Sequence, residues 1–193
     1  MYQIHTTPGF VIESRPSGEA GRVLSIFTRD LGLVRASAQG IRLEKSKLRY
    51  FTQEYSFGVF SLVRGREYWR LTGGETSPDW GGLASANVEL KARIAVLLRR
   101  LLHGEEPNQA LFECIRGGET SPIWGGLASP DLQSLESLVV LRMLHSLGYV
   151  GSAQTLEKYL QSTDITPELL SEAATNRILI NQHINKALRE SHL

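Results

Sequence analysis

The spacing of hydrophobic residues changes once along this 193-residue chain, and that change divides the fold into two parts. Up to residue 72, apolar and polar residues alternate as they do in half-buried β-strands. The expected strands are residues 9–14, 21–28, 33–38, 54–64 and 67–71. Five short strands with a longer connection after the third predict a five-stranded β-barrel of OB type, with a small SH3-like barrel as the alternative.

From residue 86 onward, apolar residues recur every three or four positions, which is the spacing of an amphipathic α-helix. Start signals lie at Asn87, at Ser129-Pro130-Asp131 and at Thr166-Pro167-Glu168, and the last is expected to open one helix over 166–188. The chain is therefore predicted to be an α+β multi-domain protein. Its expected parts are an OB-type barrel over 1–72, a linking loop over 73–85, and an all-α helical bundle over 86–193 that a second loop at 117–129 interrupts.

These two predicted loops carry nearly the same sequence. Residues 73–85 read GGETSPDWGGLAS and residues 117–129 read GGETSPIWGGLAS, so twelve of thirteen positions are identical. The flanking residues share nothing, whereas natural repeats share a diffuse pattern over a whole structural unit. We interpret the copies as engineered insertions that display Trp80 and Trp124, possible anchors for a protein binder. Natural exchange, or loops that merely cover the barrel, are the alternatives.

Charge is divided unevenly between the two halves. Residues 1–72 contain eleven Lys and Arg against six Asp and Glu, while residues 73–193 contain ten against fourteen. A basic surface attracts polyphosphates, so the barrel is the expected nucleic-acid-binding part.

Basic and aromatic residues cluster around the connection after the third expected strand. Basic side chains can follow phosphates while aromatic faces stack bases, as single-strand binding requires. The predicted nucleic-acid-binding residues are Arg15, Arg22, Arg35, Arg42, Lys45, Lys47 and Arg49, with Tyr50 and Phe51 as the stacking candidates. Phe57, Phe60 and Trp69 lie in alternating strands and are expected to fill the barrel core.

The run from Gly9 to Arg49 resembles the recombination mediator RecO family. The matching landmarks are Arg15-Pro16 with Glu19, Phe27-Thr28, Gly32, and Gly40 followed by Arg42 and Ser46. The segment His145-Ser146-Leu147-Gly148-Tyr149 is also similar to that family's helical domain. Two departures are Gln39, where a lysine usually precedes the loop glycine, and the absence of the four-cysteine zinc element of many members.

This resemblance implies an OB fold followed by a helical domain. It also implies binding of single- and double-stranded DNA, annealing of complementary strands, and partnership with RecR and the single-strand-binding protein in loading recombinase during DNA repair. The family's basic positions correspond to Arg15, Arg35, Arg42, Lys45 and Arg49. The other functions considered are an engineered scaffold for the Trp-containing loops and an OB-fold RNA or translation factor.

Catalysis, metals and cofactors are not expected. No Walker or Rossmann glycine loop is present, and the five histidines show no ligand spacing. Cys114 is the single cysteine, so an intramolecular disulfide is excluded, and its apolar neighbours predict a buried thiol. No run of eighteen apolar residues or secretory-type start is seen, which makes the cytoplasm the expected compartment.

Overall fold

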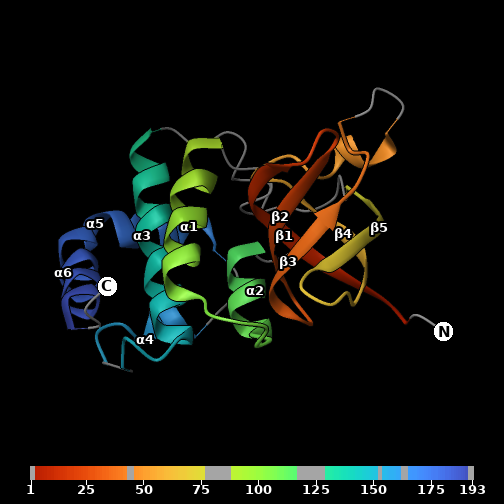
Figure 1. Cartoon of the computed structure of the whole chain (residues 1–193). Coiled ribbons are helices and arrows are strands. Elements are labelled where there is room, and N and C mark those ends of the chain that lie inside the picture. Colours follow the sequence, from red (N-terminus) through yellow and green to blue (C-terminus); the bar gives the residue numbers. More distant parts are fainter. Residues whose placement is uncertain are drawn as a thin grey trace. The chain divides into compact units, whose positions relative to one another are not determined.

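The computed structural model describes residues 3–42, 46–76, 88–116, 129–151, 154–161 and 165–190, without the side chains of 129–131 (Figure 1). These residues form two compact units. One unit contains residues 1–79 and 95–109, and the other contains residues 80–94 and 110–193. Residues 95–109, which the sequence placed with the helices, therefore fold with the barrel.

A closed five-stranded barrel forms the first unit and confirms the predicted OB-type architecture. Its strands are β1 (Ile4–Ser17), β2 (Gly21–Thr28), β3 (Gly32–Ala38), β4 (Phe57–Val63) and β5 (Trp69–Glu75). Around the barrel the order is β1-β2-β3-β5-β4. The pair β3–β5 is parallel and the other four pairs are antiparallel.

Strand boundaries differ from the sequence prediction in β1, β3, β4 and β5, and the differences of three or more residues lie in β1, β4 and β5. β1 begins at Ile4 rather than residue 9, because residues 4–10 pair with β4 while residues 9–17 pair with β2. β4 begins at Phe57 rather than residue 54. β5 extends to Glu75, so the first three residues of the segment 73–85 belong to a strand rather than to a loop.

The barrel core is made by the alternating residues that sequence periodicity selects. Phe60 and Trp69 are buried in this core, as predicted, together with Leu24, Ile26 and Leu62. Phe57 is also buried but lies outside this core cluster, where its ring stacks on that of Phe10 with the centroids 4.4 Å apart. Gly32 has a φ of 73°, and a Cβ placed there would lie 2.5 Å from the backbone oxygen of Glu106. The turn before β3 thus requires glycine both for its backbone conformation and for this close approach.

Residues 95–109 are attached to the barrel by polar contacts. Arg99 forms an ion pair of 2.8 Å with Glu13 of β1. The indole N–H of Trp69 donates to Glu105 at 3.1 Å, and Glu105 also pairs with Arg64. The backbone N–H of Leu33 donates to the carbonyl of Gly104 at 3.3 Å. Strands β1, β3 and β5 therefore all contribute to this attachment.

The helices are α1 (Val88–Leu101), α2 (Gln109–Arg116), α3 (Ser129–Ser146), α4 (Glu157–Leu160), α5 (Pro167–Thr175) and α6 (Arg177–Glu190). Within the helical unit, α5 and α6 both pack against α3. Thr166 caps α5 as predicted, since its hydroxyl accepts from the N–H of Leu169 at 3.3 Å. The single helix expected over 166–188 was wrong, because Asn176 separates α5 from α6.

Among the helices of the described segments, not one combines the length and the apolar character that crossing a bilayer would demand.

Candidate nucleic-acid interface

A pocket of about 340 Å³ lies at one end of the barrel. Its lining residues come from the start of β2, the connection after β3, and the short 3-10 helix η1 (Lys47–Tyr50) with the turn that follows it. They are Arg22, Ile41, Arg42, Arg49, Thr52 and Gln53. Three guanidinium-bearing residues from separate parts of the sequence therefore meet in one pocket.

Strand register places Arg22 at the mouth of the barrel. Arg22 pairs with Ala38 of β3, and Ala38 belongs to the barrel core together with Leu24, two residues along β2. Side chains two residues apart in a strand share a face, so Arg22 projects from the interior face where the barrel ends. Its Nη1 donates to the hydroxyl of Ser14 at 3.1 Å, which holds the side chain in position.

The helix η1 is fixed against the same end of the barrel by its apolar residues. Leu48 packs against the core cluster, and Phe51 lies 6.1 Å from Phe60, ring centroid to ring centroid. The Thr52 hydroxyl donates to the carbonyl of Leu48 at 2.6 Å. Figure 1 shows η1 as the short orange coil next to the barrel strands. With these residues anchored, Lys47, Arg49 and Tyr50 are left exposed.

The cations of the pocket are not neutralised by described acids. Within the described segments, Arg22, Arg42 and Arg49 form no ion pair with a carboxylate, and neither does Lys47. The nearby carboxylate of Glu54 instead accepts from the backbone N–H of Ser14 at 2.9 Å. The guanidinium groups are therefore available to an external anion.

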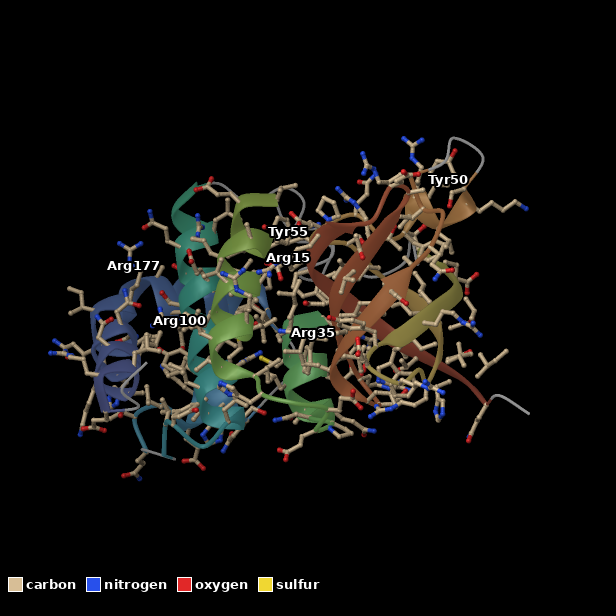
Figure 2. All side chains as sticks on the ribbon, in the orientation of Figure 1. Arg15, Arg35, Tyr50, Tyr55, Arg100 and Arg177 are labelled. Atoms are coloured by element: carbon tan, nitrogen blue, oxygen red, sulfur yellow. The ribbon has the colours of Figure 1, made fainter. Side chains whose placement is uncertain are left out.

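Other predicted basic residues lie elsewhere. Arg15 and Arg35 are exposed on the outer face of the barrel, two rows apart in the β1–β2–β3 ladder. Figure 2 shows both at a distance from Tyr50. Arg15 also pairs with Glu13 at 2.9 Å. Lys45 lies outside the described residues.

The two stacking candidates have opposite environments. Tyr50 is 75% exposed at the end of η1 and can offer its ring to a base. Phe51 is only 5% exposed and belongs to the barrel core, so its prediction as a stacking residue was wrong. The 3-10 turn directs the two consecutive side chains to opposite sides, and the sequence contains no signal for that turn. Thr52 and Gln53, which line the pocket, were missed for the same reason.

The remaining sequence predictions concern the helical unit and the loops. Trp80 and Trp124 of the repeated segments lie outside the described residues. Cys114 is 6% exposed, which confirms the predicted burial. Burial raises the pKa of the Cys114 thiol from 9.0 to about 11, and the charge of Arg142 opposes this rise.

The buried environment of Cys114 predicts a thiol that reacts slowly. A rise of two pKa units lowers the thiolate fraction near pH 8 about a hundredfold, and the thiolate is the reactive form. We expect an aromatic disulfide reagent at pH 8 to label the native protein at least about a hundredfold more slowly than the urea-unfolded chain. Because only the unfolded chain ionises between pH 9 and 11, this group's contribution should make the native state less stable as pH rises through that range. Rapid labelling under native conditions would contradict the buried position.

The barrel and its pocket can now be compared with known proteins. Residues 1–78 match the family model "Recombination protein O N terminal". This region comprises all five strands, η1 and every pocket residue.

Individual relatives of the chain carry the name of the same family. The chain is 30% identical over 117 residues to the DNA repair protein RecO of Gloeothece citriformis, covering 60% of this chain and 41% of the relative. It is 36% identical over 112 residues to the RecO of Dehalococcoides mccartyi, covering 56% and 44%. With the RecO of Acaryochloris marina it shares 38% identity over 84 residues, covering 44% and 29%. The chain thus spans less than half the length of these relatives.

Proposed function

We propose that the barrel binds single-stranded DNA at the end formed by β2, the connection after β3, and η1. The observation that carries this proposal is the convergence of Arg22, Arg42 and Arg49 on one pocket without a described acidic partner. Guanidinium groups bind phosphates through fixed, paired donors. Tyr50 follows the pocket residue Arg49 in the chain and has an exposed aromatic face, which supplies the stacking half of single-strand recognition.

The biological role that this binding serves is recombination-mediated DNA repair. The match of residues 1–78 to the RecO family model and the printed name of the relatives, DNA repair protein RecO, support this role. In this proposal the chain also binds double-stranded DNA, anneals complementary strands, and helps to load recombinase together with RecR and the single-strand-binding protein. The helical unit is the proposed docking part for these proteins. No catalysis, metal or cofactor is assigned to it, since the sequence contains no motif for them.

An annealing assay with the full chain tests this function. Complementary oligonucleotides should anneal faster with the protein than without it. The logarithm of the binding constant should fall linearly with the logarithm of the salt concentration, with a slope of about −0.7 for each phosphate contacted on a single strand. Matched RNA and DNA oligonucleotides, compared in the same assay, separate this role from that of an RNA or translation factor. Salt-independent binding, or a clear preference for RNA, would refute the proposal.

Tyr50 provides a separate prediction, because its contribution does not depend on charge. We expect Tyr50→Ala to weaken binding of single-stranded DNA by about 1–3 kcal/mol, the contribution of one stacked base, while the salt slope stays unchanged. Fluorescence anisotropy at three salt concentrations measures both quantities. Tyr68→Ala is the matched control, since Tyr68 is also exposed but belongs to the connection between β4 and β5 and not to η1, whose Arg49 lines the pocket. Equal losses in the two variants would remove Tyr50 from the interface.

The repeated segments support a second candidate function, an engineered scaffold for peptide display. Their near-identity over thirteen positions favours it. In this case a binder raised against the 13-residue peptide should capture the chain, and replacing Trp80 and Trp124 should abolish capture while DNA binding persists. Failure of such a binder to capture the unaltered chain would refute this function.

A further inference from the structure

The pocket at the barrel end has a positive charge that suits a doubly charged phosphate group. Three arginines line about 340 Å³, and none of them has an acidic partner among the described residues. We infer that this pocket holds a terminal phosphate monoester at the end of a DNA strand, rather than a phosphodiester within it. The inference rests on the proposed DNA binding and specifies which part of the strand the pocket recognises.

Charge is the first reason. A phosphodiester carries one negative charge, whereas a phosphate monoester carries about −1.5 to −2 at pH 7 and has three strong acceptor oxygens. Three guanidinium groups supply more positive charge than one diester can balance. They also provide donors in a fork geometry that can engage each terminal oxygen. A dianion is therefore the better match for Arg22, Arg42 and Arg49.

The second reason is the way in which the pocket is built. Its lining includes the buried residues Ile41 and Thr52, and the three arginines come from β2, from the loop after β3 and from η1. A phosphodiester placed there needs room for chain on both of its sides, whereas a strand end needs room on one side only.

Neighbouring groups are arranged for the same ligand. Arg22 is held by Ser14, so its guanidinium loses little freedom on binding. The Thr52 hydroxyl donates its only proton to the carbonyl of Leu48, so the side-chain donors left for the ligand belong to the three arginines and Gln53. Tyr50 follows Arg49 directly in η1 and is exposed, so the base attached to the terminal phosphate can stack on its ring.

The test compares three fluorescent single-stranded oligonucleotides of one sequence with the full chain. One carries a 5′-phosphate, one a 3′-phosphate, and one has hydroxyl groups at both ends, with the fluorophore inside the strand. We expect one phosphorylated end to bind at least about tenfold more tightly than the hydroxyl oligonucleotide, because hydrogen bonds to charged groups contribute more than neutral ones. The two phosphorylated arms identify which end is recognised.

Variants link this preference to the pocket. Arg22→Gln, Arg42→Gln and Arg49→Gln together should reduce the preference to less than about twofold, and Arg49→Gln alone should reduce it in part. Arg66→Gln is the control, since Arg66 is exposed in the β4–β5 connection and does not line the pocket. Far-UV circular dichroism checks that each variant folds. If the triple variant does not fold, the single variant and the unaltered protein still test the inference.

The pH dependence gives an independent readout. The second ionisation of a phosphate monoester has a pKa near 6, so the preference should be smaller at pH 5 than at pH 7.5. The charged residues that line the pocket are Arg22 of β2, Arg42 of the following loop and Arg49 of η1, with Lys47 and Glu54 at neighbouring positions of the chain. Arginine remains protonated throughout this range, and the hydroxyl oligonucleotide, measured at each pH, corrects for protein groups that change protonation, so the change in preference reports the ligand.

Each outcome has a definite meaning. Equal affinity for the three oligonucleotides at pH 7.5, or a preference that persists in the triple variant, overturns the inference. Salt-dependent binding of the hydroxyl oligonucleotide in that case leaves the proposed DNA binding intact. Failure to bind any of the three overturns the proposed function itself.

Discussion

Replacing Arg22, Arg42 and Arg49 together by glutamine is expected to weaken binding of a single-stranded oligonucleotide that carries the preferred terminal phosphate by about 3 kcal/mol or more, which is at least about a hundredfold. The physical reason is the loss of three charge-assisted contacts in one pocket. The same change should lower the slope of log K against log salt by about 0.7, since the three arginines converge on one phosphate and each phosphate contact on a single strand contributes about 0.7. Fluorescence anisotropy between 50 and 200 mM salt measures both effects.

A control with the same net charge shows whether position matters. Arg66, Arg100 and Arg189 are exposed, and none of them lines the barrel-end pocket. Replacing these three by glutamine removes the same total charge but should change the affinity by less than about 1 kcal/mol. Equal losses in the two triple variants would mean that DNA responds only to the net charge of the chain, and the pocket would have no special role.

Phe60→Ala is expected to have the largest effect on stability. Phe60 has no exposed surface, stacks edge-on against Phe51, and lies beside Gly9 of β1 in the middle of the barrel. Removing a buried phenylalanine ring costs about 3–5 kcal/mol through lost burial and the cavity that remains. That loss is a large fraction of the stability of about 5–15 kcal/mol that native proteins have.

Urea denaturation, monitored by hydrogen exchange of the backbone amides, measures the loss of stability in each unit separately. Amides of β1, β4 and β5 should lose protection at lower urea concentrations in the variant, and DNA binding should fall with them. Ile4→Ala serves as the control, because Ile4 is largely exposed at the start of β1 and should change the stability by less than about 0.5 kcal/mol. If the amides of the barrel keep the same protection from exchange in the variant, Phe60 does not make this contribution to the stability of the core.

The hydrophobic spacing predicted the barrel correctly because the residues that face the barrel interior alternate along the strands. Leu24, Ile26, Phe60 and Leu62 all lie at alternating positions and are all buried. The first part of β1 escaped prediction because Thr6, Thr7 and Pro8 do not alternate, and these residues become a strand only by pairing with β4. Closure of the barrel, rather than local preference, makes that segment extended.

The candidate site was predicted in part. Arg22, Arg42 and Arg49 were among the basic residues selected from the sequence, and the structure brings them into one pocket. Arg15 and Arg35 were selected on the same grounds but lie on the outer face of the barrel. Tyr50 and Phe51 are adjacent in sequence, yet one is exposed and the other is buried.

By itself, the sequence determined the architecture of a β-barrel followed by helices, the basic character of the barrel half, and the burial of Cys114. These properties follow from the spacing and composition of residues along the chain, which do not depend on how the chain folds. Only the tertiary structure decided which arginines share a pocket and which aromatic ring remains accessible. Those relations depend on strand register and on the way η1 packs against the barrel, and both arise from contacts between residues distant along the chain.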